Sequence, residues 1–405
     1  MRVTVLTLLL AAAAVGPRPS EPPTTNPPIT TLASPARPGS GEAFLAAGPA
    51  GSIALTWFEV RPRGGHRLRY ATRAGSHWSA ATTIAEGDSF FVNWADFPSV
   101  VVLEDGTLAA HWLWKAGAGT YAYHVRLAFS RDRGRTWSRP IVPHRDGTPT
   151  EHGFVSLVAA GDRVRAVWLD GRNTGGEPPG PMTLRTALVA PDGTMSDEWE
   201  LDDRVCDCCQ TATARTRRGL VVAYRDRSDE EIRDIAVVRQ VEGRWSAPVL
   251  VPGDRWKFPG CPVNGPSLAA AGDRVVLAWF TAARDSPQVK VAVSNDGGAS
   301  FEPGVRVDRG AALGRVDVTM IEGGAALVSW LERDGGRATL RHRVIPARGT
   351  WPPDRVVAAM TSGRAGGFPQ VIVDGRRVVF AWTDAGKPSR VRLGSYRLGD
   401  RPLDH

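Results

Sequence analysis

The sequence is short of lysine, of cysteine and of long apolar runs, and each shortage narrows the class of protein. Of its 50 basic residues only 4 are lysine, and no basic run alternates with aromatic residues as in a nucleic-acid groove. Beyond the first residues no apolar stretch reaches the roughly 20 residues of a membrane-spanning helix. We therefore expect neither a nucleic-acid partner nor a membrane span. The formal net charge of +8 comes from arginine, which suits an acidic ligand, although codon bias also enriches this residue type.

The two ends of the chain differ from its centre. Residues 1–16 combine a basic start, an apolar middle and small residues after it, which predicts a secretory signal peptide and export to the periplasm or the extracellular space. Residues 17–40 are rich in proline, serine and threonine and predict an extended linker. Residues 401–405 are predicted to be a polar tail.

A short apolar run that ends in an aromatic residue recurs through the chain, usually after a glycine turn. The aromatic residues are Trp57, Trp112, Trp168, Tyr224, Trp279, Trp330 and Trp382. They are separated by 55, 56, 56, 55, 51 and 52 residues. A period of this size indicates repeated units that bury their apolar faces against their neighbours.

The unit around Tyr224 shows the internal pattern of the repeat. Short apolar segments at 211–215, 220–224, 234–240 and 246–251 are joined by tight turns, which predicts a four-stranded antiparallel meander. Seven such units over residues 41–400 predict an all-β fold, a seven-bladed β-propeller of four-stranded antiparallel blades. Six blades are the alternative if one unit is degenerate. The last unit lacks a strand, so we expect an N-terminal strand at 28–33 to close the ring.

Two turns share a second pattern. Residues 130–137 and 294–301 fit Ser-x-Asp-x-Gly-x-Thr-Trp, the second with serine and phenylalanine at its last two places. In this pattern the aspartate binds the turn backbone and the glycine takes a positive φ. On these turns the chain resembles the sialidase-like Asp-box (BNR-repeat) propellers over 43–398.

The resemblance implies a glycoside hydrolase that acts on acidic glycans. Such enzymes grip the sugar carboxylate with three arginines and use an aspartate as acid/base and a glutamate-activated tyrosine as nucleophile. The arginines that could form the grip are Arg172, Arg225, Arg227 and Arg315, and the acid could be Asp96 or Asp226. The family's early Arg-Ile-Pro motif is absent, and no tyrosine stands out as a nucleophile.

Meander topology places the starts of first strands and the ends of second strands on one face, beside a central funnel. These positions are rich in charged, aromatic and cysteine side chains, so we predict a ligand site there. The predicted catalytic residues are Asp96, Asp170, Asp226 and Glu231, of which Asp170 with Asp226 or Glu231 would suit ordinary glycosidase chemistry. The predicted ligand-binding residues are Trp94, Glu151, His152, Arg172, Arg225, Arg227, Asn264, Arg315 and Asp317.

The cysteines all lie at two neighbouring funnel entries and should form one cluster. An even number in an exported chain predicts disulfides first, here a bridge from Cys261 to Cys206, Cys208 or Cys209. The alternatives are a thiolate site for Cu(I) or Zn(II), with His152 as a further candidate ligand, and a reactive thiol.

The sequence thus leaves three functions open. The first is an exported, monomeric propeller that hydrolyses an acidic glycan in the manner of an exo-sialidase, with a carbohydrate or another acidic small ligand as partner. The second is a non-catalytic module that binds a glycan or a protein at the funnel. The third is a metal or redox protein built on the cysteines.

Overall fold

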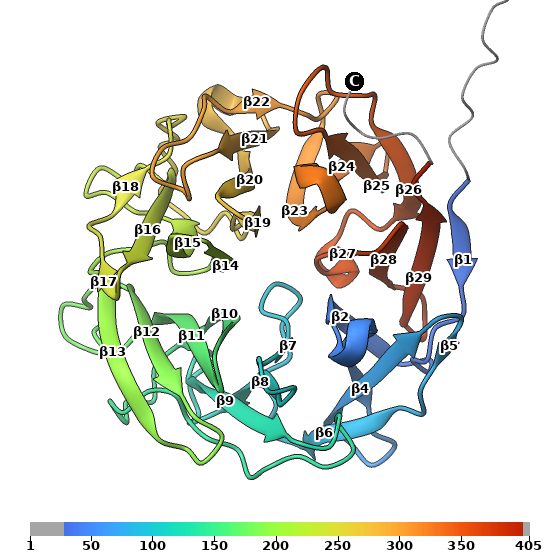
Figure 1. Ribbon diagram of the computed structural model, residues 1–405. Helices are drawn as coiled ribbons and strands as arrows, with labels where there is room; N and C mark the ends of the chain where they lie inside the picture. The colour runs from blue at the N-terminus through green and yellow to red at the C-terminus, as the bar shows by residue number, and fades with distance from the viewer. Residues whose placement is uncertain (1–27, 400–405) are drawn as a thin grey trace, which may run out of the picture.

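The computed structural model describes residues 28–399, which form seven antiparallel blades around a central channel (Figure 1). Six blades have at least four strands each. The remaining blade has three, and an isolated bridge between Leu127 and Ile141 takes its outer position. The predicted propeller is therefore confirmed with seven blades. No helix among these residues is long and apolar enough to cross a bilayer.

The strands of each blade run outward from the channel in chain order, except that the N-terminal strand is the outermost strand of the last blade. The first strands are β2 (Ser40–Ala47), β7 (Ser99–Val102), β10 (His152–Ala160), β14 (Ala212–Thr216), β19 (Ser267–Ala271), β23 (Ala312–Met320) and β27 (Gln370–Asp374). The second strands are β3 (Ile53–Val60), β8 (Leu108–Lys115), β11 (Arg163–Asp170), β15 (Gly219–Arg225), β20 (Arg274–Thr281), β24 (Ala326–Asp334) and β28 (Arg377–Asp384). The third strands are β4 (His66–Ala74), β9 (Tyr123–Ser130), β12 (Thr183–Val189), β16 (Ile235–Val241), β21 (Gln288–Ser294), β25 (Arg337–Ile345) and β29 (Arg390–Arg397). The outer strands are β1 (Thr30–Leu32), β5 (His77–Trp78), β6 (Thr82–Gly87), β13 (Met195–Asp202), β17 (Arg244–Trp245), β18 (Val249–Leu250), β22 (Val305–Arg306) and β26 (Arg355–Met360).

The N-terminal strand β1 closes the ring, as predicted. It pairs antiparallel with β29, Thr30 opposite Ser395 and Leu32 opposite Leu393, and so supplies the outer strand of the last blade (Figure 1). The following segment also packs on the ring, because Ala36 is only 1% exposed. The predicted signal peptide and tail lie outside the described residues.

The repeated aromatic residues pack between the blades. Three of them each donate a hydrogen bond to an acid at the same position of the repeat. The indole Nε1 of Trp57, Trp168 and Trp330 donates to the acid two residues later, and all three rings are fully buried. These bonds go to Glu59 (2.7 Å), Asp170 (2.8 Å) and Glu332 (3.0 Å). A buried indole N–H needs an acceptor, so these acids serve the core.

The two Ser-x-Asp turns have the same hydrogen bonds. Asp132 accepts from the backbone N–H of Thr136 at 2.9 Å, and Asp296 accepts from that of Ser300 at 3.0 Å. Each turn's first serine accepts from the backbone N–H of its glycine, at 2.8 and 2.9 Å. The aromatic residue of the first turn, Trp137, packs edge-on against Tyr70 of the neighbouring blade. The turns therefore fix one blade against the next.

Candidate functional site

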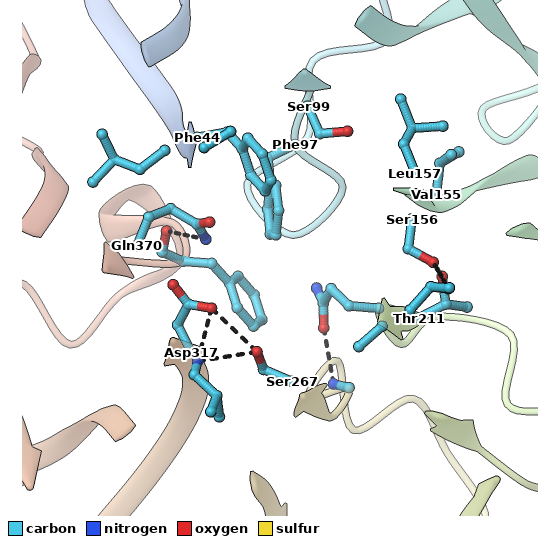
Figure 2. A pocket seen from close by; sticks show the side chains of 18 of the residues that line it. Phe44, Phe97, Ser99, Val155, Ser156, Leu157, Thr211, Ser267, Asp317 and Gln370 are labelled. Atoms are coloured by element: carbon cyan, nitrogen blue, oxygen red, sulfur yellow. Dashed lines mark hydrogen bonds between the residues drawn. The ribbon is translucent and has the colours of Figure 1, made fainter. Parts of the chain in front are cut away.

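The central channel holds a cavity of about 320 Å³ that all seven first strands or their entries line (Figure 2). Aromatic rings stand at one side of it. Phe44 and Phe97 are stacked with centroids 6.0 Å apart, and Phe97 lies 5.8 Å from Phe368. Gln370 adds an amide on the same side of the cavity as these rings (Figure 2). The volume is that of a small-ligand pocket.

Three of the first strands carry the same irregularity where they enter the channel. β2, β10 and β23 each have a β-bulge, and the bulges contain Glu42 (φ 48°), Phe154 (φ 53°) and Arg315 (φ 53°). Non-glycine residues rarely adopt this left-handed backbone, and a bulge turns its side chain away from the pleat. Of these three residues, Phe154 lines the cavity.

Several predicted site residues clamp one blade to the next at this same level. The backbone N–H donors and their acceptors are Phe154 to Asp96 (2.8 Å), Arg315 to Asn264 (2.8 Å) and Val371 to Asp317 (2.7 Å). Figure 2 shows Asp317 also bonded to Ser267. Burial raises the pKa of Asp317 to about 7 and that of Asp96 well above its usual range. Asp96, Asn264 and Asp317 thus join neighbouring blades of the ring.

A tyrosine and a glutamate meet beside Asp96. The hydroxyl of Tyr123 donates to Glu151 Oε1 at 2.6 Å, and the ring is 1% exposed and stacked on Phe91 at 4.0 Å. Burial, and then the Glu151 and Asp96 carboxyls, raise the pKa of Tyr123 well above its usual range. Burial also raises the pKa of Glu151 to about 7. The sequence analysis found no nucleophile among the tyrosines and so missed this pair, although Tyr123 is the first residue of β9, at the funnel end of a third strand.

Two of the predicted arginines are bound to backbone carbonyls. Arg225 donates to the carbonyl oxygens of Asn264 at 2.8 Å and of Phe280 at 2.7 Å, and it is 2% exposed. Arg315 donates to those of Gly363 at 3.1 Å and Gly367 at 3.0 Å. Neither guanidinium is free for a ligand carboxylate.

The other two predicted arginines pair with acids of the chain. Arg172 binds both oxygens of Asp170 at 2.8 Å. Arg227 binds Glu231 at 2.8 Å and Asp207 at 3.2 Å. The four predicted arginines are therefore all engaged within the protein.

Trp94 and Phe368 form an aromatic pair near the channel mouth, and the exposed Arg364 lies beside this pair. Trp94 is half-buried and stacks on Phe368 with centroids 5.7 Å apart. The guanidinium of Arg315 lies 4.7 Å and that of Arg364 5.9 Å from the Trp94 ring. Arg364 is exposed. Trp94 and Arg364 thus border the mouth of the channel.

The predicted catalytic acids other than Asp96 occupy three different environments. Asp170 is fully buried; burial alone would raise its pKa, but hydrogen bonding to Arg172 and the nearby His152 lower it to about 2. Asp226 is half-buried, and burial raises its pKa to about 6. Glu231 bridges Arg227 and Arg233. No hydrogen bond among the described residues joins Asp170 to Asp226 or Glu231, and their pairing as catalytic acids stays a prediction.

His152 lies in a separate cluster from the cysteines. Its ring stacks on His144 with centroids 3.8 Å apart, and its Nε2 is 3.0 Å from Asp146. Ligand atoms of His124, His144 and His152 lie within 4.8 Å of one another, so this group could also hold a metal ion. His152 therefore belongs to this histidine cluster and is not placed as a ligand of the cysteine site.

The cysteines form the predicted cluster. The Sγ of Cys206 is 3.4 Å from that of Cys209 and 3.9 Å from that of Cys208, and the ligand atoms of these three lie within 4.8 Å of one another. Cys261, from the neighbouring loop, lies near Cys208. All four are free thiols, so the predicted disulfide is not confirmed. Arg233 donates to Cys206 Sγ at 3.1 Å. Neither Arg233 nor Asp207 was among the predicted site residues.

Comparison with known proteins gives the fold a context. No family model matches the chain, and no curated protein matches it. The BP39L lectin from Burkholderia pseudomallei is 14% identical with a TM-score of 0.59 and covers 89% of this chain and 99% of its own. An ulvan lyase in complex with a glucuronate–sulfated rhamnose unit is 10% identical with a TM-score of 0.58, covering 92% and 96%. A protein of unknown function from Dyadobacter fermentans is 15% identical with a TM-score of 0.54, covering 92% and 98%. At these identities the likeness shows the propeller fold alone, and membership of the sialidase-like family stays a prediction.

Proposed function

We propose that the protein is an exported glycan-binding propeller that holds a sugar at the mouth of the central channel. The observation that carries this is the composition of the cavity wall. Phe44 and Phe97 present half-buried ring faces, and Gln370 presents an amide beside them. A pocket with apolar faces and a few placed polar groups is the usual form of a small-ligand site. A lectin and a polysaccharide lyase on the same architecture support the proposal by analogy only.

The same geometry favours binding over sialidase-type hydrolysis. A three-arginine grip needs three free guanidinium groups converging on one carboxylate, and the four predicted arginines are bound within the chain. Arg364 is the exposed cation beside Trp94. We therefore propose that an acidic sugar would meet one arginine at the rim, and that its ring would lie on the phenylalanines.

The test is calorimetric titration of the full chain with a panel of neutral and acidic oligosaccharides. Phe97→Ala should weaken binding at least about tenfold, because it removes the central ring of the pocket wall. Trp199→Ala is the matched control, since Trp199 is 51% exposed on the outer strand β13. Unchanged affinity in Phe97→Ala, or no binding of any sugar by folded protein, would contradict the proposal.

One observation favours a glycoside hydrolase as the second candidate. The Tyr123 hydroxyl bonded to Glu151, with Asp96 beside them, brings together the residue types that the sialidase resemblance implies. Glu151, with its pKa raised to about 7, could donate a proton near neutral pH. A fluorogenic sialoside and a panel of aryl glycosides test this. If the wild type turns over a substrate and folded Glu151→Gln does not, the protein is a hydrolase. If the wild type binds a sugar without turning it over, the protein is a binding module.

A further inference from the structure

We propose that the four cysteines form a site for one thiophilic d¹⁰ ion, Cu(I) or Zn(II), on the funnel face of the ring. The inference is independent of the proposed glycan site. It rests on the spacing of the sulfurs: Cys206 Sγ lies 3.4 Å from Cys209 Sγ and 3.9 Å from Cys208 Sγ. Thiolates about 2.3 Å from a shared ion stand about 3.8 Å apart in a tetrahedral site. A disulfide would need about 2.05 Å. The thiols therefore already have the spacing of ligands.

The chain holds the cluster in place from two separate loops. The backbone N–H of Cys206 donates to the carbonyl of Arg225 at the end of β15, at 3.0 Å, and Cys206 and Cys209 are 0% and 1% exposed. Cys261 comes from the loop between β18 and β19 and is exposed. An ion bound here would join the loops of two neighbouring blades, with the exposed Cys261 on its solvent side.

Positive charge is positioned to support thiolate ligands. Arg233 donates to Cys206 Sγ at 3.1 Å, and its other guanidinium nitrogens donate to the Phe258 carbonyl and to Glu231, so its orientation is fixed. N–H donors to a coordinating sulfur are the usual second layer of a metal site. Loading Zn(II) on four thiols releases four protons and leaves a dianionic centre. Loading Cu(I) on three releases three protons and leaves the same charge, half of which the single positive charge of Arg233 offsets.

The experiment uses the full chain purified under reducing conditions, then exposed to Zn(II) alone or to Cu(I) alone, and analysed for bound metal and free thiols. We expect one ion per chain and protection of three or four thiols from a thiol reagent. Cys206→Ser should abolish the bound ion. Cys261→Ser separates the two ions, because a trigonal Cu(I) site on the remaining three cysteines would keep its ion, whereas a four-thiolate Zn(II) site would lose most of its affinity.

The control variant is His144→Ala, which disrupts the imidazole cluster and leaves every cysteine in place. Its metal content should match that of the wild type, and circular dichroism checks that all variants fold. Four thiols that stay reactive after both metals, a bound ion that follows His144 instead of Cys206, or an oxidised chain whose mass shows disulfides as isolated would each overturn the proposal.

Discussion

Many charged residues near the funnel form hydrogen bonds with other groups of the protein. Glu59, Asp170 and Glu332 accept from buried indoles, and Arg225 and Arg315 bind carbonyl oxygens of the entry loops. A buried donor without an acceptor costs more than a typical hydrogen bond contributes, which explains why a repeat of tryptophans carries a repeat of acids. Single residues at the rim are therefore best tested first for stability and then for binding.

The acid two residues after the repeat aromatic should stabilise the fold only where it is buried. Glu332→Ala should lower the free energy of unfolding by about 1–3 kcal/mol, because it leaves the Trp330 indole and the Arg309 backbone N–H without their acceptor and Arg341 without its partner. Asp384 occupies the same repeat position in the last blade, but its side chain is 47% exposed and pairs with Arg392. Asp384→Ala should change stability by less than about 0.5 kcal/mol. Urea denaturation of both variants checks this, and equal losses would argue against the indole contact as the cause.

Asp317 should make the protein less stable as the pH rises through the acidic range. Burial raises its pKa from 3.8 to about 7 in the folded chain. Between these values the folded state holds a proton that the unfolded state has lost, so this group's contribution to stability falls from about pH 4 to about pH 7. Asp317→Asn, which carries no titrating group at this position, should make that decline shallower in urea titrations at about pH 5 and pH 7. Asp96, Glu151 and Asp226, whose pKa values burial also raises, account for the remainder. Asp162→Asn, at a side chain 80% exposed, is the control; a decline as steep in Asp317→Asn as in the wild type would count against the assignment.

Single elements determine how the ring closes and how the channel is shaped. The bulges of β2, β10 and β23 place left-handed residues at the mouth, and the side chain of each clamp residue binds the backbone of the next blade. The short strand β1 completes the last blade by pairing with β29. This pairing adds to the contacts of the first blade with the last, where Gly39 donates to the Ser389 carbonyl and Ser40 accepts from the Val391 N–H.

Removing β1 should therefore destabilise the whole ring. A chain that begins at residue 34 leaves β29 as an unpaired edge strand, which exposes N–H and carbonyl groups and invites association with other chains. A chain that begins at residue 28 keeps β1 and serves as the control. We expect a lower melting temperature and concentration-dependent light scattering only in the shorter chain. Identical melting of the two chains would show that β1 contributes nothing to closure.

Across the whole molecule, the period of the sequence predicted the ring, but it could not predict which side chains meet within it. The spacing of the aromatic residues is a local property of each unit, and it implies seven blades directly. The pairing of Tyr123 with Glu151, and the placement of His152 with His144 rather than with the cysteines, depend on contacts between strands and loops that no spacing specifies. The cysteine cluster was predictable because its loops belong to adjacent units and only four cysteines exist.

A ligand at the channel mouth should stabilise the entire ring as one unit. Phe44, Phe97 and Gln370 come from three blades that β1 and the inter-blade clamps tie together, so the mouth cannot form unless the ring is closed. A sugar that binds only the folded chain should add about 2.7 kcal/mol at 100 times its dissociation constant. Differential scanning calorimetry should show one transition that moves to higher temperature with added sugar in the wild type and in Trp199→Ala, and by about half as much or less in Phe97→Ala. If the transition were split and only part of it shifted, the blades would unfold separately. Formation of the channel mouth would then not depend on closure of the ring.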